Sequence, residues 1–372
     1  MEDLKQGEKL QKLIEDSCNP KEEAEKICIT AAENNASYEE CLELLSITDK
    51  FNIPYGHYKL YKRMGDFFLI NQKFQESFVY YTIAMDILNE NNMKEEKIFL
   101  FNNMGINKLK MLQYDEAIVY FDSSLMLSNM IKKYDIYTKI LYNLALAYLS
   151  IYKIEEAITA IIKCYKRLDK HSEAQLYIKL KILEANCYEE KGCFSKCIEI
   201  YYTLLKGEDN INNTLLGNIY NNIASLFLKG KNYSESSIYF DKAYDNRNTY
   251  DKWLLSHVLI DKAELYYDTQ DLEKFYITIF QGIELCKEYS DYEYWIKAMM
   301  KLEKAYRKEN NTEKLRSTYL EMLEISKKNN LEKDIMYSLN KLINLEIKLK
   351  NFEVAFKYND MLNEYIEKIV NI

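Results

Sequence analysis

Proline and glycine are scarce in this sequence, with only 2 Pro and 9 Gly among 372 residues. An average protein uses about 7% Gly and about 5% Pro. Tight β-turns and breaks in helices depend on these two residues, because Gly allows positive φ angles and Pro removes a backbone donor. Their scarcity argues against a turn-rich β-protein and favours an all-α fold with short connections.

Histidine is also scarce, and the common motifs of catalysis and nucleotide binding are missing. None of the three His lies in an HExxH motif, beside a candidate Ser or Cys nucleophile, or paired with a second His; they are His57, His171 and His257. Neither GxxxxGK[ST] nor GxGxxG occurs. Three of the eight Cys lie close together, but without a CxxC pair or a nearby His; they are Cys187, Cys193 and Cys197. We therefore expect no catalytic residues, no metal and no cofactor.

Long apolar runs are absent as well. No stretch of 18 apolar residues occurs, so the sequence offers no membrane-spanning helix. The chain begins MEDLKQGEKL, which is charged where a secretory signal would be apolar. We therefore expect a cytoplasmic protein that does not associate with membranes.

The first 50 residues are strongly acidic. They hold 13 Asp and Glu against 6 Lys, a net charge of −7 out of the chain's −8. Phosphate would repel such a segment, which argues against a DNA-reading domain. One helix is predicted to begin at Asn19-Pro20 with Asn19 as its cap, and a second to run from Ser37 to about Lys50 with Ser37 as its cap. We expect residues 1–50 to form a helical N-terminal cap.

From residue 51 onward the chain repeats one pattern about every 40 residues. Its clearest copy consists of Gly105, Ala117, Phe121 and Ser124, which are small, small, large and small at offsets 0, 12, 16 and 19. We call the residue at offset 0 the repeat mark; the marks stand at 65, 105, 145, 185, 224, 263, 303 and 343. Small residues at these offsets let two antiparallel helices approach closely, and the large residue fills the gap between neighbouring hairpins.

This pattern resembles the tetratricopeptide repeat, whose usual period is about 34 residues. The resemblance covers roughly Tyr55 to Leu362 and weakens in the last two units, where Glu303 and Ile343 replace the small residue at the mark. It implies a right-handed superhelical solenoid of about eight long hairpins over residues 51–372, ended by a C-terminal capping helix. In such a fold each repeat contacts mainly its neighbours.

In a solenoid of this kind the first helix of each hairpin lines the inner, concave face. Asparagine recurs there close to the marks, at Asn103, Asn143, Asn222, Asn102, Asn221 and Asn186. An amide offers one acceptor and two donors, so it can bond both the C=O and the N–H of an extended peptide. Basic residues project toward the same groove, where they could bind a carboxylate; they are Lys59, Lys62, Arg63, Lys139 and Lys179. Asp261 and His257 occupy inward positions too.

A structural explanation of the same residues stays open. The sequence is generally rich in Asn and Lys, so some inward Asn would arise by chance. An inner-face Asn can also simply bond the neighbouring helix, because its amide offers donors and an acceptor to any partner.

About eight long-period hairpins with Asn along the inner face resemble the RRNPP family, the peptide-responsive quorum-sensing regulators of Gram-positive bacteria. The resemblance implies a short signalling peptide held in the concave groove, with Asn103, Asn143 and Asn222 as the best matches to the family's backbone-binding Asn. It also implies a change in superhelix pitch or dimer arrangement on peptide binding. The homodimer contacts in such regulators are often made by the C-terminal repeats, and their output is transcription regulation.

The sequence departs from this family at its N-terminus, where no helix-turn-helix is recognisable. DNA would then be reached only through a domain absent from this chain, or the protein would act on another protein such as a response regulator. The competing interpretation, from a different class, is a scaffold or adaptor whose groove binds the tail or helix of a partner protein.

Overall fold

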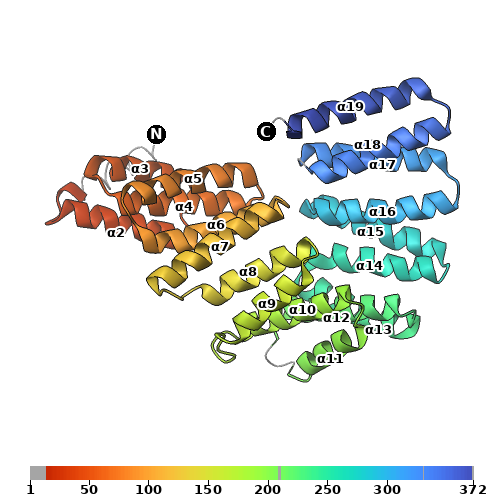
Figure 1. Cartoon of the computed structure of the whole chain (residues 1–372), viewed down its shortest axis with the longest axis horizontal. Helices are drawn as coiled ribbons and strands as arrows, with labels where there is room; N and C mark the ends of the chain where they lie inside the picture. The colour runs from red at the N-terminus through yellow and green to blue at the C-terminus, as the bar shows by residue number, and fades with distance from the viewer. Residues whose placement is uncertain (1–13, 208–210, 330, 371–372) are drawn as a thin grey trace. The chain divides into compact units, whose positions relative to one another are not determined.

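The computed structural model describes residues 14–207, 211–329 and 331–370, and within these ranges every regular element is a helix (Figure 1). The first of them are α2 (Pro20–Glu33), α3 (Tyr38–Phe51), α4 (Pro54–Ile70), α5 (Phe74–Glu90), α6 (Lys94–Lys110), α7 (Tyr114–Ile131), α8 (Tyr137–Ser150), α9 (Ile154–Tyr165), α10 (Ala174–Glu190) and α11 (Phe194–Leu205). They are followed by α12 (Asn213–Lys229), α13 (Tyr233–Tyr250), η2 (Lys252–Leu254), α14 (Leu255–Asp268), α15 (Leu272–Tyr289), α16 (Tyr292–Lys308), α17 (Thr312–Lys328), α18 (Glu332–Lys348) and α19 (Phe352–Val370). The predicted all-α fold is confirmed. Across the described ranges, no helix has both the length and the apolar character needed to cross a bilayer.

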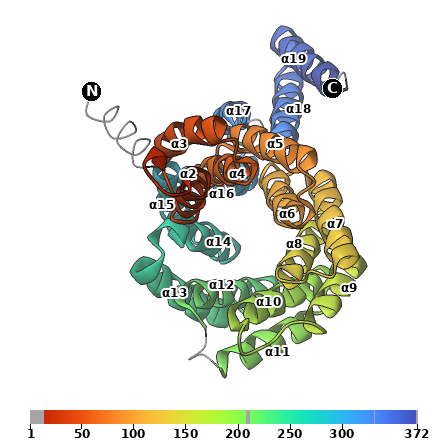
Figure 2. The same cartoon turned by 90° about the vertical axis from the view of Figure 1, so that its left-hand side faces the viewer.

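The chain divides into two compact units, Met1–Ile200 and Tyr201–Ile372, and α11 crosses the division. The even-numbered helices from α4 to α18 carry the repeat marks and are the first helices of the hairpins. The odd-numbered helices from α5 to α19 are the second helices. In the first unit, α4, α6 and α8 lie on the inner side of the curve that the unit makes, and α5, α7 and α9 lie on its outer side (Figure 2).

The glycines at two repeat marks explain why a small residue pairs with a large one. A Cβ added to Gly65 would lie 2.5 Å from the ring of Tyr81, and one added to Gly105 would lie 2.5 Å from the ring of Phe121. Both rings are fully buried. In these repeats the aromatic residue at offset 16 packs directly on the backbone of the first helix, which a side chain at the mark would prevent. The predicted pairing is confirmed here.

The small residue at offset 12 does more than permit a close approach. The Ser77 hydroxyl donates to the carbonyl of Gly65 at 2.8 Å, and the Ser236 hydroxyl donates to that of Ala224 at 2.9 Å. In both cases the acceptor is the mark itself. Because donor and acceptor are buried, this bond ties the two helices of a hairpin together without exposing a polar group.

The hairpin turns share one backbone conformation. In all eight, the residue seven positions after the mark has φ between 53° and 71°; these residues are Gln72, Leu112, Tyr152, Gly192, Lys231, Gln270, Asn310 and Lys350. The next N–H then donates to the carbonyl five residues earlier, as from Asn232 to Phe227 at 2.8 Å. This is the Schellman pattern, which satisfies carbonyls at a helix C-terminus. Only one of the eight residues is Gly, so glycine did not mark these turns in the sequence.

The two predicted N-terminal helices are present, but one predicted cap is wrong. Helix α2 begins at Pro20 as expected, yet the Asn19 amide donates to the Glu22 carboxylate at 2.7 Å and caps no backbone N–H. Helix α3 is capped as predicted. The Ser37 hydroxyl accepts from the Glu40 backbone N–H, and the Glu40 carboxylate accepts from the Ser37 backbone N–H, which completes a capping box.

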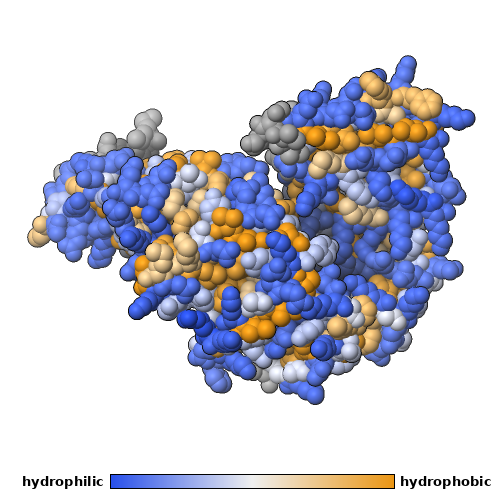
Figure 3. All heavy atoms as spheres, in the orientation of Figure 1, coloured by the Kyte–Doolittle hydropathy of each residue, from blue (hydrophilic) through white to orange (hydrophobic). Residues whose placement is uncertain are grey.

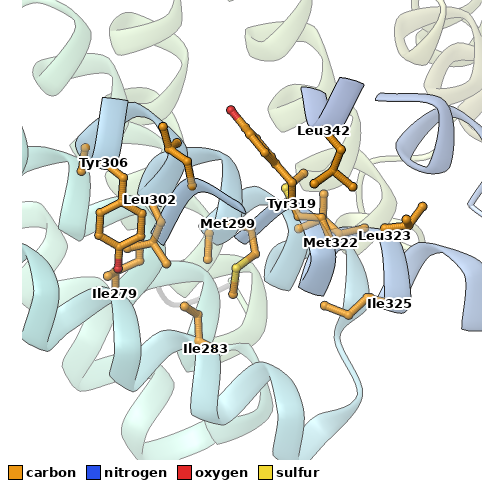
Figure 4. Close-up of a cluster of buried hydrophobic side chains, with 14 of the residues drawn as sticks. Ile279, Ile283, Met299, Leu302, Tyr306, Tyr319, Met322, Leu323, Ile325 and Leu342 are labelled. Atoms are coloured by element: carbon orange, nitrogen blue, oxygen red, sulfur yellow. The ribbon is translucent and has the colours of Figure 1, made fainter. Parts of the chain in front are cut away.

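The hydrophobic core follows the stack of helices. In the second unit, buried side chains of α15, α16, α17 and α18 point toward one another (Figure 4); those labelled are Ile279, Ile283, Met299, Leu302, Tyr306, Tyr319, Met322, Leu323, Ile325 and Leu342. In the first unit, α2, α3 and α4 share a buried cluster that includes Cys28, Leu44 and Leu60. Each hairpin therefore covers the apolar side of the next one, as expected of a solenoid.

The mark of the seventh repeat is a buried carboxylate instead of a small residue. Glu303 is 5% exposed, and it accepts from the Tyr337 hydroxyl at 2.7 Å and from the Lys341 amine at 3.0 Å. Burial alone would raise the pKa of Glu303, but these hydrogen bonds outweigh burial and hold the pKa below its ordinary value. The weaker repeat pattern is therefore offset by a polar contact between α16 and α18.

Candidate functional site

Polar residues recur in four rows on the first helices, at six, three and two residues before the mark and at one residue after it. We call these rows the first-helix face. Positions three or four apart lie on one side of an α-helix, so the rows fall on a single side of each first helix. Several of these side chains bond from one first helix to the next, 34 to 41 residues away in the sequence.

Asp66 of α4 is the centre of one such cluster. Its carboxylate pairs with Lys62 at 2.7 Å and accepts from the Asn103 amide of α6 at 3.0 Å. The Tyr81 hydroxyl also donates to it, at 2.6 Å. Burial, together with the negative charge of Asp66, raises the pKa of Tyr81, so this hydroxyl stays protonated and remains a donor. Two of the predicted peptide-binding residues, Lys62 and Asn103, are therefore brought together here.

Asn102 and Asn143 form the next link. The Asn143 amide of α8 donates to the Asn102 oxygen of α6 at 3.0 Å. Asn102 is 8% exposed, whereas Asn143 is half-buried. An amide has two N–H donors and an oxygen with two lone pairs, so one bond uses only part of the capacity of Asn143.

Arg63 points away from this polar row. Its guanidinium donates to the carbonyls of Ala36 at 2.9 Å and Asn35 at 3.0 Å, which lie between α2 and α3. Arg63 thus holds that connection against α4. Lys59 lies 3.9 Å from Glu96 of α6.

The remaining predicted residues of the first unit lie on α8 and α10. Lys139 and Lys179 stand six residues before their marks, and both are exposed. Asn186 stands one residue after the mark of α10 and is half-buried. This part of the first-helix face is therefore open to solvent and basic at two positions.

In the second unit, a charged residue, Asp261, takes part in the bonds between first helices. The Asn221 amide of α12 donates to Asp261 of α14 at 3.0 Å, and Lys297 of α16 pairs with the other Asp261 oxygen at 2.7 Å. Burial would raise the pKa of Asp261, but the charges of Lys297 and Lys301 outweigh burial, so the pKa lies below its ordinary value. The Asn221 oxygen is buried and accepts no hydrogen bond from the described residues.

Asn222 and His257 have partners of their own. The Asn222 amide donates to the buried Tyr201 hydroxyl at 3.0 Å. His257 of α14 lies 2.6 Å from the Asp291 carboxylate, and its ring stacks on Tyr294 with 3.4 Å between ring centroids. His257 therefore links α14 to the start of α16.

Two members of the face were missed by the sequence analysis. Asp66 stands one residue after its mark, the row in which Asn186 had been noticed, and Lys297 stands six before its mark, in the row of Lys139 and Lys179. Applying the same two rows to all eight repeats would have found both. Across the described ranges, no group of three or more His, Cys, Asp or Glu side chains lies close enough to hold a metal ion.

No protein-family model and no curated protein matches the sequence. Several solved structures do. The quorum sensor NprR from B. thuringiensis, in its apo form, matches with a TM-score of 0.59 at 15% identity over 93% of this chain and 98% of its own. NprR in complex with its cognate peptide NprX matches with a TM-score of 0.60 at 15% identity, over 95% of this chain and 99% of its own.

A Rap protein complexed with competence and sporulation factor matches with a TM-score of 0.61 at 12% identity, over 95% of this chain and 99% of its own. Aspartyl phosphate phosphatase F from Bacillus subtilis matches with a TM-score of 0.54 at 13% identity, over 92% of this chain and 93% of its own. At these identities the likeness concerns the fold. The fold resembles that of tetratricopeptide-repeat quorum sensors of the RRNPP type, as the sequence pattern predicted.

Proposed function

We propose that this chain is an intracellular receptor for a short signalling peptide, which binds in extended form along the first-helix face of the first unit. The chain acts by binding and not by catalysis, and its output is a regulatory change in conformation or in oligomeric state. Two of the similar structures were solved with a signalling ligand present, NprX in one and competence and sporulation factor in the other. That likeness supports the same kind of ligand here.

The proposal rests on the amides of the first-helix face, which use only part of their hydrogen-bonding capacity in contacts with the protein. In their contacts with protein groups, Asn143 of the first unit and Asn222 of the second each donate one N–H, whereas Asn103 donates to Asp66 and also bonds the Tyr81 hydroxyl. Asn143 and Asn222 each keep a second N–H and an oxygen, and Asn103 keeps its oxygen, to serve the backbone of an extended peptide. Lys139 and Lys179 supply charge for a terminal carboxylate.

Asn143→Ala is the sharpest test of this ligand. It removes an amide from the middle of the row, and we expect peptide affinity to fall by about 1–3 kcal/mol, or roughly 5- to 150-fold. The full chain would first be used to capture ligands from a pool of random peptides of about seven residues, and calorimetry with the best-retained peptide would then compare the variants. Folding should change little, because the lost bond to Asn102 is worth about 1 kcal/mol.

Asn340→Ala is the matched control, since Asn340 also lies on a first helix, three residues before its mark, but is exposed and bonds within its own helix. Its peptide affinity should equal that of the unmodified chain. If Asn143→Ala lowers stability but leaves affinity unchanged, Asn143 serves only the helix contact. If no short peptide binds while a partner protein does, the chain is an adaptor.

We further propose a homodimer formed through the last helix. Phe352, Phe356 and Ile366 of α19 are 65%, 66% and 41% exposed, and their spacing places them on one side of the helix. A row of hydrophobic side chains is visible along α18 and α19 (Figure 3). Large exposed aromatic residues at the end of a stack are costly unless another surface covers them.

The double variant Phe352→Lys/Phe356→Lys should therefore be monomeric at concentrations where the unmodified chain is a dimer. Sedimentation equilibrium measures this directly, and peptide affinity serves as the check on folding. Val354→Lys is the control, because Val354 lies on the opposite side of α19 and should leave the dimer intact. A monomeric unmodified chain, or a dimer that survives the double variant, would contradict the proposed interface.

A further inference from the structure

The second helices of the first two repeats carry charge of one sign only. Helices α5 and α7 contain no Lys or Arg, although every later second helix contains at least one. They hold six carboxylates, all on exposed residues: Glu76, Asp86, Glu90, Asp115, Glu116 and Asp122. Lys108 of the neighbouring helix α6 pairs with one of them, Glu116, at 2.8 Å. The outer side of these two helices is therefore strongly acidic.

An exposed apolar stripe lies within this acidic surface. It consists of Val119, Met126 and Met130 on α7, which are 63%, 64% and 71% exposed, together with Val79 on α5, which is 56% exposed. The α7 residues are spaced by seven and four positions, so they follow one side of the helix. We call these four residues the outer stripe.

The internal repeat shows that this stripe is a local departure. The helical position of Met126 is occupied by Asp86 in the preceding repeat and by Glu284 on α15. The helical position of Met130 is occupied by Glu90 on α5 and by Glu288 on α15. Packing of a hairpin therefore does not require an apolar residue at either place, and the two methionines need another explanation.

The two helices form one continuous surface. Val79 and Val119 both stand 14 residues after their marks, and their neighbours Phe78 and Tyr120 contact each other edge to face, with 6.1 Å between ring centroids. Hydrophobic side chains are also seen over this part of the first unit, in the region of α7 and α8 (Figure 3). The stripe runs from Val119 to Met130 of α7, 11 steps along the helix, which is about 16 Å or three helical turns.

The geometry points to a docking site for a basic amphipathic helix of a partner protein, which would lay its apolar side on the outer stripe and its Lys and Arg against the acidic rim. Three turns match the length of the stripe, and helices that dock in this way use apolar residues at helical spacing. Methionine adapts its shape to a partner surface, which suits such a contact. A second copy of the same face is disfavoured, because it would oppose carboxylates to carboxylates.

This inference does not depend on peptide binding, since the stripe lies on second helices and the proposed peptide site on first helices. The probe is a capped synthetic peptide of about 15 residues with Leu at helical spacing and Lys at most other positions. We expect saturable binding to the full chain in calorimetry, weakened by added salt because the attraction is partly electrostatic. A peptide of the same composition with its Leu residues scattered should bind about tenfold more weakly or not at all.

The variant Met126→Lys/Met130→Lys replaces two apolar residues of the outer stripe with charges that repel the basic peptide, and it should weaken probe binding at least about tenfold. Ile277→Lys on α15 is the matched control, being 52% exposed on a second helix of the other unit, and should leave binding unchanged. The inference is overturned if the double variant binds as well as the unmodified chain, or if both peptides bind equally. It is also overturned if the chain dimerises in sedimentation equilibrium and this double variant abolishes the dimer, since the face would then serve self-association.

Discussion

Phe121→Ala is expected to lower the free energy of unfolding by about 3–5 kcal/mol. The ring is fully buried and sits on the backbone of Gly105, where a Cβ would lie 2.5 Å away. Removing it leaves a cavity between α6 and α7 that neither helix can fill, because the interior is closely packed. Urea unfolding followed by far-UV circular dichroism measures the loss. Val119→Ala on the same helix is the control, since Val119 is 63% exposed and its substitution should change stability by about 0.5 kcal/mol or less.

Gly105, on which the Phe121 ring packs, allows a second test of this contact that does not depend on the size of the cavity. Gly105→Ala alone should cost about 1–3 kcal/mol, because the new methyl group meets the Phe121 ring. In the Phe121→Ala background the methyl group has room, so Gly105→Ala should cost little or should stabilise. The two substitutions would then be strongly non-additive. Additive costs would mean that the ring and the glycine do not constrain each other.

This pair also illustrates how much of the fold could be predicted from the sequence. The spacing from Gly105 to Phe121 specified two helices in close contact, and the capping box at Ser37 fixed where α3 begins. The turns were harder, because the left-handed residue is Leu112 or Tyr152 as readily as a glycine. Packing of the two helices forces that conformation, so the local sequence carries no signal for it. Asn19 does not cap α2: its amide nitrogen donates to the Glu22 carboxylate, and its side chain accepts from no backbone N–H of the helix.

The first-helix face was predictable in position but not in its contacts. Periodicity located the first-helix face, since Asn103 and Asn143 recur two residues before the mark. It could not show that these amides bond to Asp66 and Asn102, because such contacts depend on the packing of helices about 40 residues apart. Arg63 failed to join the row for a related reason. It lies on the first hairpin, where its neighbour is the connection between α2 and α3 and not another first helix.

Arg316→Ala should lower the free energy of unfolding by about 1–3 kcal/mol, because it removes two hydrogen bonds from a buried carboxylate; Arg316 itself is 39% exposed, so water can take part of its place. Glu346 of α18 is 1% exposed, and Arg316 of α17 binds it through two nitrogens, at 2.5 Å and 2.7 Å. Asn351, in the turn before α19, donates a third hydrogen bond at 2.9 Å. This carboxylate therefore joins three consecutive elements at the end of the stack, next to the proposed dimer helix. Urea unfolding of the variant measures the loss.

The cost of Arg316→Ala should also depend on pH. Burial would raise the pKa of Glu346, but hydrogen bonds from Arg316 and Asn351 outweigh burial and hold it below the ordinary value of 4.5. In the unmodified protein this group therefore stabilises the fold above that value, and the contribution is lost as the pH falls through the lowered pKa. Without Arg316 burial dominates, the pKa of Glu346 rises, and acid relieves the stranded charge by protonation. The stability gap between the two proteins should thus narrow between about pH 7 and about pH 4. Glu346→Gln removes the titrating group. In that background Arg316→Ala should cost less stability, and its cost should not change with pH. If the cost of Arg316→Ala is independent of pH in both backgrounds, packing and not charge holds α17 to α18.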